Sequence, residues 1–191
     1  IGRERIELST LATPVDTTTL VLGGREVKTD QVVVAHPQRE TADCMNSVWT
    51  VYFSAPDNSI KGNYILLNGN YEVGKNAIAH IAVPSNIQPT YSPSGKSLVA
   101  VTIVGDAAKA LDLDSNESIE KQARLELRDL FEKSDTWETI EVFHTKNALP
   151  PSESQSNASS SVNFNQDEIV CCGDHTTHGS MEGAIKSADH A

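Results

Sequence analysis

The residues best suited to hold a ligand lie near the carboxyl end of the chain. A short apolar run ends in Gly173-Asp174, a polar turn follows, and a helix is predicted to begin around Gly179-Ser180. A glycine lets a ligand approach the backbone closely, and a carboxylate can accept hydrogen bonds from the hydroxyls of a sugar or ribityl chain. The first amides of a helix are unpaired and carry about half a unit of positive charge. This order therefore predicts a crevice for a phosphate-bearing ligand or cofactor at the carboxyl end of a strand.

The same segment resembles the carboxyl-terminal FAD motif of flavin-dependent amine oxidases and phytoene desaturases. That motif reads Gly-Asp, a few polar residues, and then Gly-Ser-x-x-Gly-Ala-x-x-Ser-Gly. The matching residues are Gly173, Asp174, Gly179, Ser180, Gly183, Ala184 and Ser187, with Ala188 in place of the last glycine. The resemblance implies that the Asp174 carboxylate accepts a hydrogen bond from a ribityl hydroxyl of FAD. It also implies that the first amides of the helix face the flavin ring, where they stabilise the anion that forms on reduction.

An earlier segment resembles a second element of the same superfamily, Ile-x-Leu-x-Thr-x-Val followed by Val-x-Leu-x-x-Gly and Ala-Asp-x-Val-Val-x-Ala. The matches are Ile6, Leu8, Thr10, Val21, Gly24, Asp30, Val32, Val33 and Ala35. Ala12 stands at the last valine of the first part, whose backbone often lies beside the adenine of FAD in this family. Together the two elements imply FAD-binding residues at Ala12, Gly173, Asp174, Gly179, Ser180, Met181, Glu182 and Gly183. Neither element identifies a catalytic residue.

The hydrophobic pattern predicts an α/β region combined with an antiparallel sheet, an α+β fold. We expect residues 1–47 to be part of a Rossmann-like FAD-binding domain, with a hairpin and a returning strand, Val32–Ala35, buried on both faces. Residues 48–149 alternate strands with turns and predict an inserted antiparallel substrate-binding subdomain. Residues 150–166 predict a flexible linker rich in Ser, Asn and Pro, and residues 167–191 predict the carboxyl-terminal FAD-binding strand and helix.

The clearest helix signal covers Ser115–Lys133. Ser115 or Asn116 can cap it, and Ile119, Ala123 and Leu127 recur at helical spacing. Aromatic residues are concentrated in the same part of the chain. They are Trp49, Tyr52, Phe53, Tyr64, Tyr71 and Tyr91. We expect them either to line an apolar substrate cavity or to pack within the sheet.

Composition excludes several classes of function. The formal net charge of -11 argues against binding to nucleic acid, and no run approaches the roughly 20 apolar residues of a membrane span. The three cysteines do not form a disulfide framework, so we expect a reducing compartment, the cytoplasm or the plastid stroma. Leu67-Asn68-Gly69 and Tyr91-Ser92-Pro93 resemble a cyanobacterial and plastid branch of the superfamily.

A metal site is the main alternative reading of the carboxyl-terminal turn. Cys172, His175 and His178 have the spacing of zinc ligands. The Gly-Asp inside that spacing is better explained by the flavin motif, so we expect no metal. We expect His36 to be a surface-loop histidine, with a place near the cofactor as the alternative. We expect His80 to be a structural histidine, with a place in the substrate pocket as the alternative.

The sequence therefore predicts an FAD-dependent oxidoreductase that takes hydride from a C–N or C–C bond of an amine or an apolar substrate, such as a polyene or a porphyrinogen-like compound. The amino-terminal Gly-x-Gly-x-x-Gly unit of such proteins is not in this chain, and residue 1 is Ile. We interpret the chain as the carboxyl-terminal half of the enzyme, which needs the upstream half or a covering partner. The alternative is a non-catalytic interaction or assembly protein that retains a remnant of the flavoprotein fold.

Overall fold

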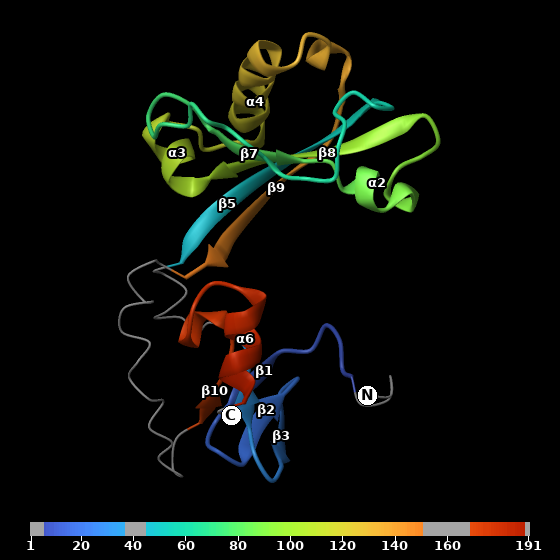
Figure 1. Ribbon diagram of the computed structural model, residues 1–191. Coiled ribbons are helices and arrows are strands. Elements are labelled where there is room, and N and C mark those ends of the chain that lie inside the picture. The colour runs from blue at the N-terminus through green and yellow to red at the C-terminus, as the bar shows by residue number, and fades with distance from the viewer. Residues whose placement is uncertain (1–5, 37–44, 151–168, 190–191) are drawn as a thin grey trace. The chain divides into compact units, whose positions relative to one another are not determined.

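The computed structural model describes residues 6–36, 45–150 and 169–189. The chain divides into two compact units (Figure 1). The first unit draws on the described parts of Ile1–Cys44 and Leu149–Ala191, and the second is Met45–Ala148. Nearly all of the predicted linker, together with Cys44, lies outside the described residues. The assignment of the units to cofactor and substrate stays a prediction.

The first unit contains a small antiparallel sheet and a short parallel pair. The sheet has the order β1-β2-β3, with strands at Ala12–Pro14, Thr19–Leu22 and Arg25–Lys28. The parallel pair joins β4, Val33–Val34, to β10, Val170–Cys171. After β10 the chain forms the 3-10 helix η4, Asp174–Thr176, and the helix α6, Met181–Ala188.

The expectation that Val32–Ala35 is buried on both faces is wrong. Val32 and Val34 are buried, but the side chain of Val33 is 48% exposed. β4 is only two residues long, and its alternating burial shows that one of its faces is packed against the unit while the face that carries Val33 is not. An apolar run alone cannot distinguish this arrangement from a strand within a larger parallel sheet.

The second unit is built on a five-stranded sheet with the order β6-β7-β8-β5-β9. The strands are β5 (Asn46–Pro56), β6 (Leu66–Leu67), β7 (Ile78–Ala82), β8 (Lys96–Val104) and β9 (Glu138–Leu149). The helices are α2 (Pro84–Ile87), α3 (Gly105–Ala110), α4 (Asn116–Leu130) and the 3-10 helices η2 (Pro89–Tyr91) and η3 (Ser134–Thr136). The pairs β5–β8, β7–β8 and β6–β7 are antiparallel, which confirms the predicted antiparallel sheet.

One face of this sheet forms the core of the second unit. Alternate residues of β5 and β8, such as Val51, Phe53 and Val101, are fully buried. They cluster with Ile119 and Leu127 of α4, which lies over this face in Figure 1. This alternation follows from the period of two in a strand that has one face in the core.

The helix α4 confirms the predicted cap. The Ser115 hydroxyl accepts from the Ser118 amide at 3.2 Å, and the Ser118 hydroxyl accepts from the Ser115 amide at 3.1 Å. This reciprocal pair satisfies two amides at the helix start, as in a capping box. The helix ends at Leu130, a little before the predicted Lys133.

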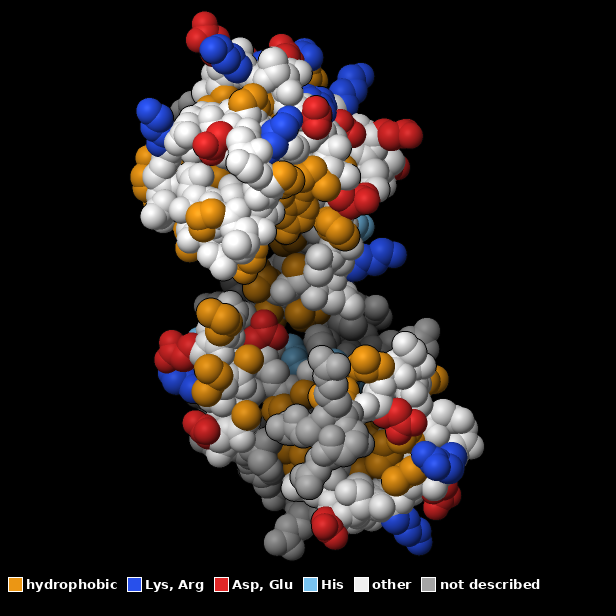
Figure 2. Space-filling model, turned by 90° about the vertical axis from the view of Figure 1, so that its right-hand side faces the viewer, with side chains coloured by type: hydrophobic (Ala, Val, Ile, Leu, Met, Phe, Trp, Pro, Cys, Tyr) orange, Lys and Arg blue, Asp and Glu red, His pale blue; other side chains and the backbone are white. Residues whose placement is uncertain are grey.

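The described surface carries mixed charge. On the face shown in Figure 2, Lys and Arg side chains are interspersed with Asp and Glu. Among the described residues, no helix has the length and apolar character needed to cross a membrane.

A single carboxylate joins α4 to the start of β7. Glu126 accepts from the amide of Ala77 at 2.7 Å and from that of Ile78 at 3.0 Å. Both amides belong to residues that are fully buried, so the carboxylate satisfies donors that water cannot reach.

We predict that Glu126→Gln lowers the free energy of unfolding by about 1–3 kcal/mol, because the amide group of Gln can accept through only one of its two polar atoms. Chemical denaturation checks this. Glu132→Gln is the matched control, because Glu132 is exposed, and its effect should stay within about 0.5 kcal/mol. Equal effects of the two variants would show that the Glu126 contacts do not stabilise the unit.

Candidate functional site

The parallel pair brings the segments after β4 and β10 to one edge. Val33 lies opposite Val170 and Val34 opposite Cys171, and the Cys172 amide donates to the Val34 carbonyl at 2.9 Å. Because the strands are parallel, their carboxyl ends point the same way. His36 follows one strand and Gly173-Asp174 follow the other. The carboxyl ends of parallel strands are where ligands bind in open α/β sheets.

Gly173 turns the chain out of β10. Its φ of 134° is unfavourable for any residue with a side chain, and an added Cβ would meet the His175 ring at 2.6 Å. The Gly173 amide donates to the Ser187 hydroxyl at 2.7 Å, and that hydroxyl donates to the Ala184 carbonyl at 2.7 Å. Because Ser187 is a buried residue of α6, these bonds hold the Gly173 turn against the buried side of that helix.

Ser180 is the N-cap of α6. Its hydroxyl accepts from the Gly183 amide at 3.0 Å and lies 2.9 Å from Nδ1 of His178. The Ser180 amide itself donates to the His178 carbonyl at 2.7 Å. The motif serine therefore caps the helix, and its amide is already used within the protein.

The next two amides, those of Met181 and Glu182, have no hydrogen-bond acceptor among the residues that the structure describes. Such amides at a helix start can bind an anionic or electron-rich ligand. The Glu182 side chain extends along the helix to Lys186, with its carboxylate 2.6 Å from Nζ. The hydrogen bond from Lys186 lowers the pKa of Glu182, with a smaller contribution from the positive charge of the same lysine.

The two other motif glycines permit close packing around this helix. An added Cβ at Gly183 would collide with the His178 carbonyl, and the Thr177 hydroxyl donates to the Gly183 carbonyl at 2.8 Å. An added Cβ at Gly179 would meet the Pro150 ring at 3.0 Å. The role of Thr177 was missed at the sequence level, since a threonine in a polar turn carries no signal of its own.

Asp174 opens η4 and is half-buried. Its backbone carbonyl accepts from the Thr177 amide at 3.2 Å. Within residues 6–36, 45–150 and 169–189, its carboxylate has no hydrogen-bond donor. The carboxylate oxygens can therefore accept hydrogen bonds from a ligand.

His175 adds a titratable group to the same turn. Burial lowers the pKa of His175, the negative charge of Asp174 raises it, and the positive charge of His36 lowers it. This electrostatic interaction links His36 to the turn. Among the described residues, Cys172, His175 and His178 do not belong to any group of three ligands that could hold a metal ion.

Ala12 belongs to another sheet of the same unit. It begins β1, lies opposite Leu22 of β2, and is exposed. The sheet of Ala12 is tied to the start of β4, since the Val32 amide donates to the Thr17 carbonyl at 2.7 Å. Its place beside an adenine stays a prediction.

In the second unit, sheet packing accounts for several of the predicted aromatics. Trp49 and Phe53 lie in the core, while Tyr64 and Tyr91 are more than 60% exposed. Tyr52 lies on the other face of the sheet and forms an edge-to-face contact with Phe143, with ring centroids 5.8 Å apart. His80 lies opposite Thr102, and burial lowers the pKa of His80.

Residues 74–191, more than half of the chain, match the model of a family described as flavin-containing amine oxidoreductases. The chain belongs to this family. No curated protein matches it.

Solved structures share the fold at low identity. The PF1083 protein of Pyrococcus furiosus has a TM-score of 0.65 and 11% identity over 95% of this chain and 46% of that one. Putrescine oxidase bound to putrescine has a TM-score of 0.60 and 13% identity over 93% and 46% of the two chains. Reduced UDP-galactopyranose mutase has a TM-score of 0.59 and 13% identity over 84% and 39%. The chain therefore spans about half the length of the structures it matches or less.

We predict that Gly183→Ala destabilises the first unit by about 1–3 kcal/mol, because the new methyl group displaces the His178 carbonyl. Helix propensity alone predicts the opposite, a gain of about 1 kcal/mol. Native-state hydrogen exchange of the α6 amides measures the change. Lys186→Ala, at an exposed position of the same helix, is the control. A slower exchange in Gly183→Ala would contradict the packing described here.

Proposed function

We propose that the turn between β10 and α6 forms part of an FAD site in a flavin-dependent oxidoreductase. The observation that carries the proposal is the combination of three features in one turn. The Asp174 carboxylate and the amides of Met181 and Glu182 have no hydrogen-bond partner among the described residues, and Gly173, with its positive φ, turns the chain between β10 and these groups. Membership of the flavin-containing amine oxidoreductase family supports a flavin as the ligand.

The unpaired groups of the turn match two parts of FAD, the ribityl chain and the flavin ring. A ribityl chain offers hydroxyl donors, and the Asp174 carboxylate offers acceptors without a competing donor in the described structure. The flavin ring gains negative charge on reduction, and two free amides at a helix start stabilise negative charge near them. When bound, FAD accepts a hydride from the substrate. The residues of this chain orient the cofactor and adjust its charge.

We further propose that the first unit is part of a Rossmann-like FAD domain and that the second unit binds the substrate. A half-buried face of the second sheet, which carries Tyr52, His80 and Thr102, supports the second assignment. The side chains of this face are mainly apolar or weakly polar. They favour an apolar substrate, or an amine with apolar carbon chains, and disfavour a highly charged substrate. The substrate named in the putrescine oxidase structure is a diamine, which is consistent with a C–N bond as the site of oxidation.

The Met181 amide can be removed without removing the helix. Met181 is the first helical residue, a position where proline is favoured, and Ser180 before it has the extended backbone that proline requires. We predict that Met181→Pro in the complete protein weakens FAD binding about three- to tenfold, the effect of one lost hydrogen bond. Titration of the apoprotein with FAD, followed by flavin fluorescence, measures the affinity.

Met181→Ala is the matched control, because the side chain is 86% exposed and the amide is kept. It should bind FAD as the unchanged protein does. If both variants bind equally well, the helix amide does not contact the flavin.

We predict that Asp174→Ala weakens FAD binding about tenfold or more, because the carboxylate is a charged acceptor. Asp189→Ala, which removes an exposed carboxylate at the other end of α6, should have no effect. A purified complete protein that is colourless and does not take up added FAD would overturn the proposed function and favour an assembly role.

A further inference from the structure

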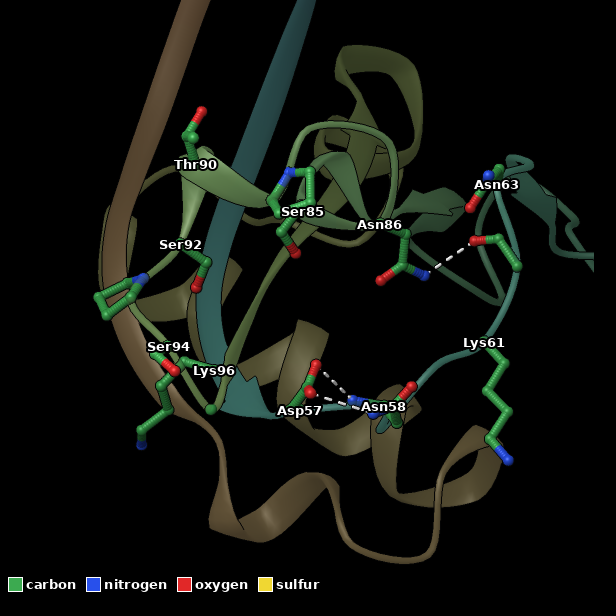
Figure 3. A pocket seen from close by; sticks show the side chains of 14 residues that line it. Asp57, Asn58, Lys61, Asn63, Ser85, Asn86, Thr90, Ser92, Ser94 and Lys96 are labelled. Carbon is green, nitrogen blue, oxygen red and sulfur yellow. Dashed lines mark hydrogen bonds between the residues drawn. The ribbon is translucent and has the colours of Figure 1, made fainter.

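A polar cavity of about 740 Å³ lies in the second unit, where β5 ends and β8 begins. Its lining comes from the loop after β5, from α2 and the segment that follows it, and from the turn before β8 (Figure 3). All of its described lining residues belong to the second unit. The cavity is therefore a feature separate from the turn between β10 and α6, and it goes beyond the proposed function.

Hydrogen bonds between the lining segments hold the cavity in shape. The side-chain amide of Asn86 in α2 donates to the carbonyls of Ile60 and Gly62 at 2.9 and 2.8 Å. The Asp57 amide donates to the Gly95 carbonyl at 3.1 Å. These bonds connect all three segments, so a ligand would meet walls that are already in place.

Ser85 supplies a buried donor to this space. The residue is only 9% exposed, and its hydroxyl accepts from the Leu98 amide at 2.9 Å. Its own proton has no acceptor among the described residues, and Figure 3 shows the hydroxyl directed into the cavity. An unused buried donor costs free energy, which a ligand acceptor would recover.

Acceptors face the same space. Because the Asn86 nitrogen is used by two carbonyls, its side-chain oxygen is left to accept (Figure 3). The two carboxylate oxygens of Asp57 accept from the backbone and side-chain nitrogens of Asn58, each at 3.0 Å. Oδ1 also accepts from the Ser97 hydroxyl at 3.4 Å, so Oδ2 is the oxygen that keeps accepting capacity for a ligand. Ser92 also lines the cavity, and its hydroxyl can both donate and accept.

The positive charges at the rim do not point into the cavity. The ammonium groups of Lys61 and Lys96 extend away from its centre in Figure 3, and Nζ of Lys96 lies 3.8 Å from the Glu138 carboxylate. An anionic ligand would therefore meet Asp57 before it met a lysine. The inward groups are suited to a ligand whose own groups both donate and accept, which is the property of hydroxyls.

We propose that this cavity binds a neutral polyhydroxy compound of the size of a monosaccharide or disaccharide. Its volume lies within the range of small-molecule sites, about 300–1,000 Å³. Ser85 donates to a ligand oxygen, while Asn86 and Asp57 accept from ligand hydroxyls.

The test is a titration of the complete, isotope-labelled protein with glucose, galactose, mannose, maltose and cellobiose, followed by amide chemical shifts. We expect at least one sugar to shift the amides around Ser85 and Asn86, with millimolar affinity. Ser85→Ala and Ser92→Ala should each weaken this binding about three- to tenfold, and Ser92→Ala does so without touching a buried hydrogen bond. Ser134→Ala, at a buried serine outside the cavity, should leave it unchanged.

Three results would overturn the proposal. One is the absence of shifts at these amides with every sugar up to about 50 mM, a concentration that detects millimolar affinities. Another is equal binding by the unchanged protein and the Ser92→Ala and Ser85→Ala variants. The third is stronger binding of inorganic phosphate or gluconate than of the neutral sugars, which would assign the cavity to anions. None of these measurements depends on FAD, so the outcome is independent of the flavin assignment.

Discussion

The hydrogen bond from the Gly173 amide to the Ser187 hydroxyl is the contact on which the carboxyl-terminal site depends. It joins the residue that leaves β10 to the buried side of α6. The direction of the helix, and so the position of its free amides, follows from this bond and from the Ser180 cap. Two serines of the motif thus act on the protein itself, and the groups left for a ligand are the Asp174 carboxylate and two backbone amides.

Local sequence signals predicted what depends on local contacts. The cap and the apolar spacing of α4 are set by residues within one or two helical turns, so Ser115 and Ile119 could be identified directly. The exposure of Val33 depends on what packs over its face of β4, which is a tertiary contact, and even the partner strand of β4 comes from far along the chain. The Ser180 amide donates to the His178 carbonyl. This bond could not be predicted from the sequence, because it depends on the path of the backbone through the turn.

The polar cavity in the second unit was not foreseen for a related reason. Its polar side chains are mainly Asp, Asn, Ser and Thr, which are ordinary residues for turns and loops. Only the sheet brings these turns together, because β5 ends where β8 begins. The fold itself does not identify a substrate, since a putrescine oxidase and a UDP-galactopyranose mutase share it. Chemistry in this family must be argued from individual side chains and amides.

The order of the strands also bears on how the chain reaches its folded state. β4 and β10 are separated by roughly 135 residues, and closing so long a loop costs conformational entropy. In the sequence, the second unit comes between these two strands, and its own first and last strands, β5 and β9, are neighbours in one sheet, with the start of β5 near the end of β9 in Figure 1. Once that sheet has formed, only about 30 connecting residues separate the two strands, which lowers the closure cost by about 1 kcal/mol. We therefore expect the second unit to fold before β4 pairs with β10.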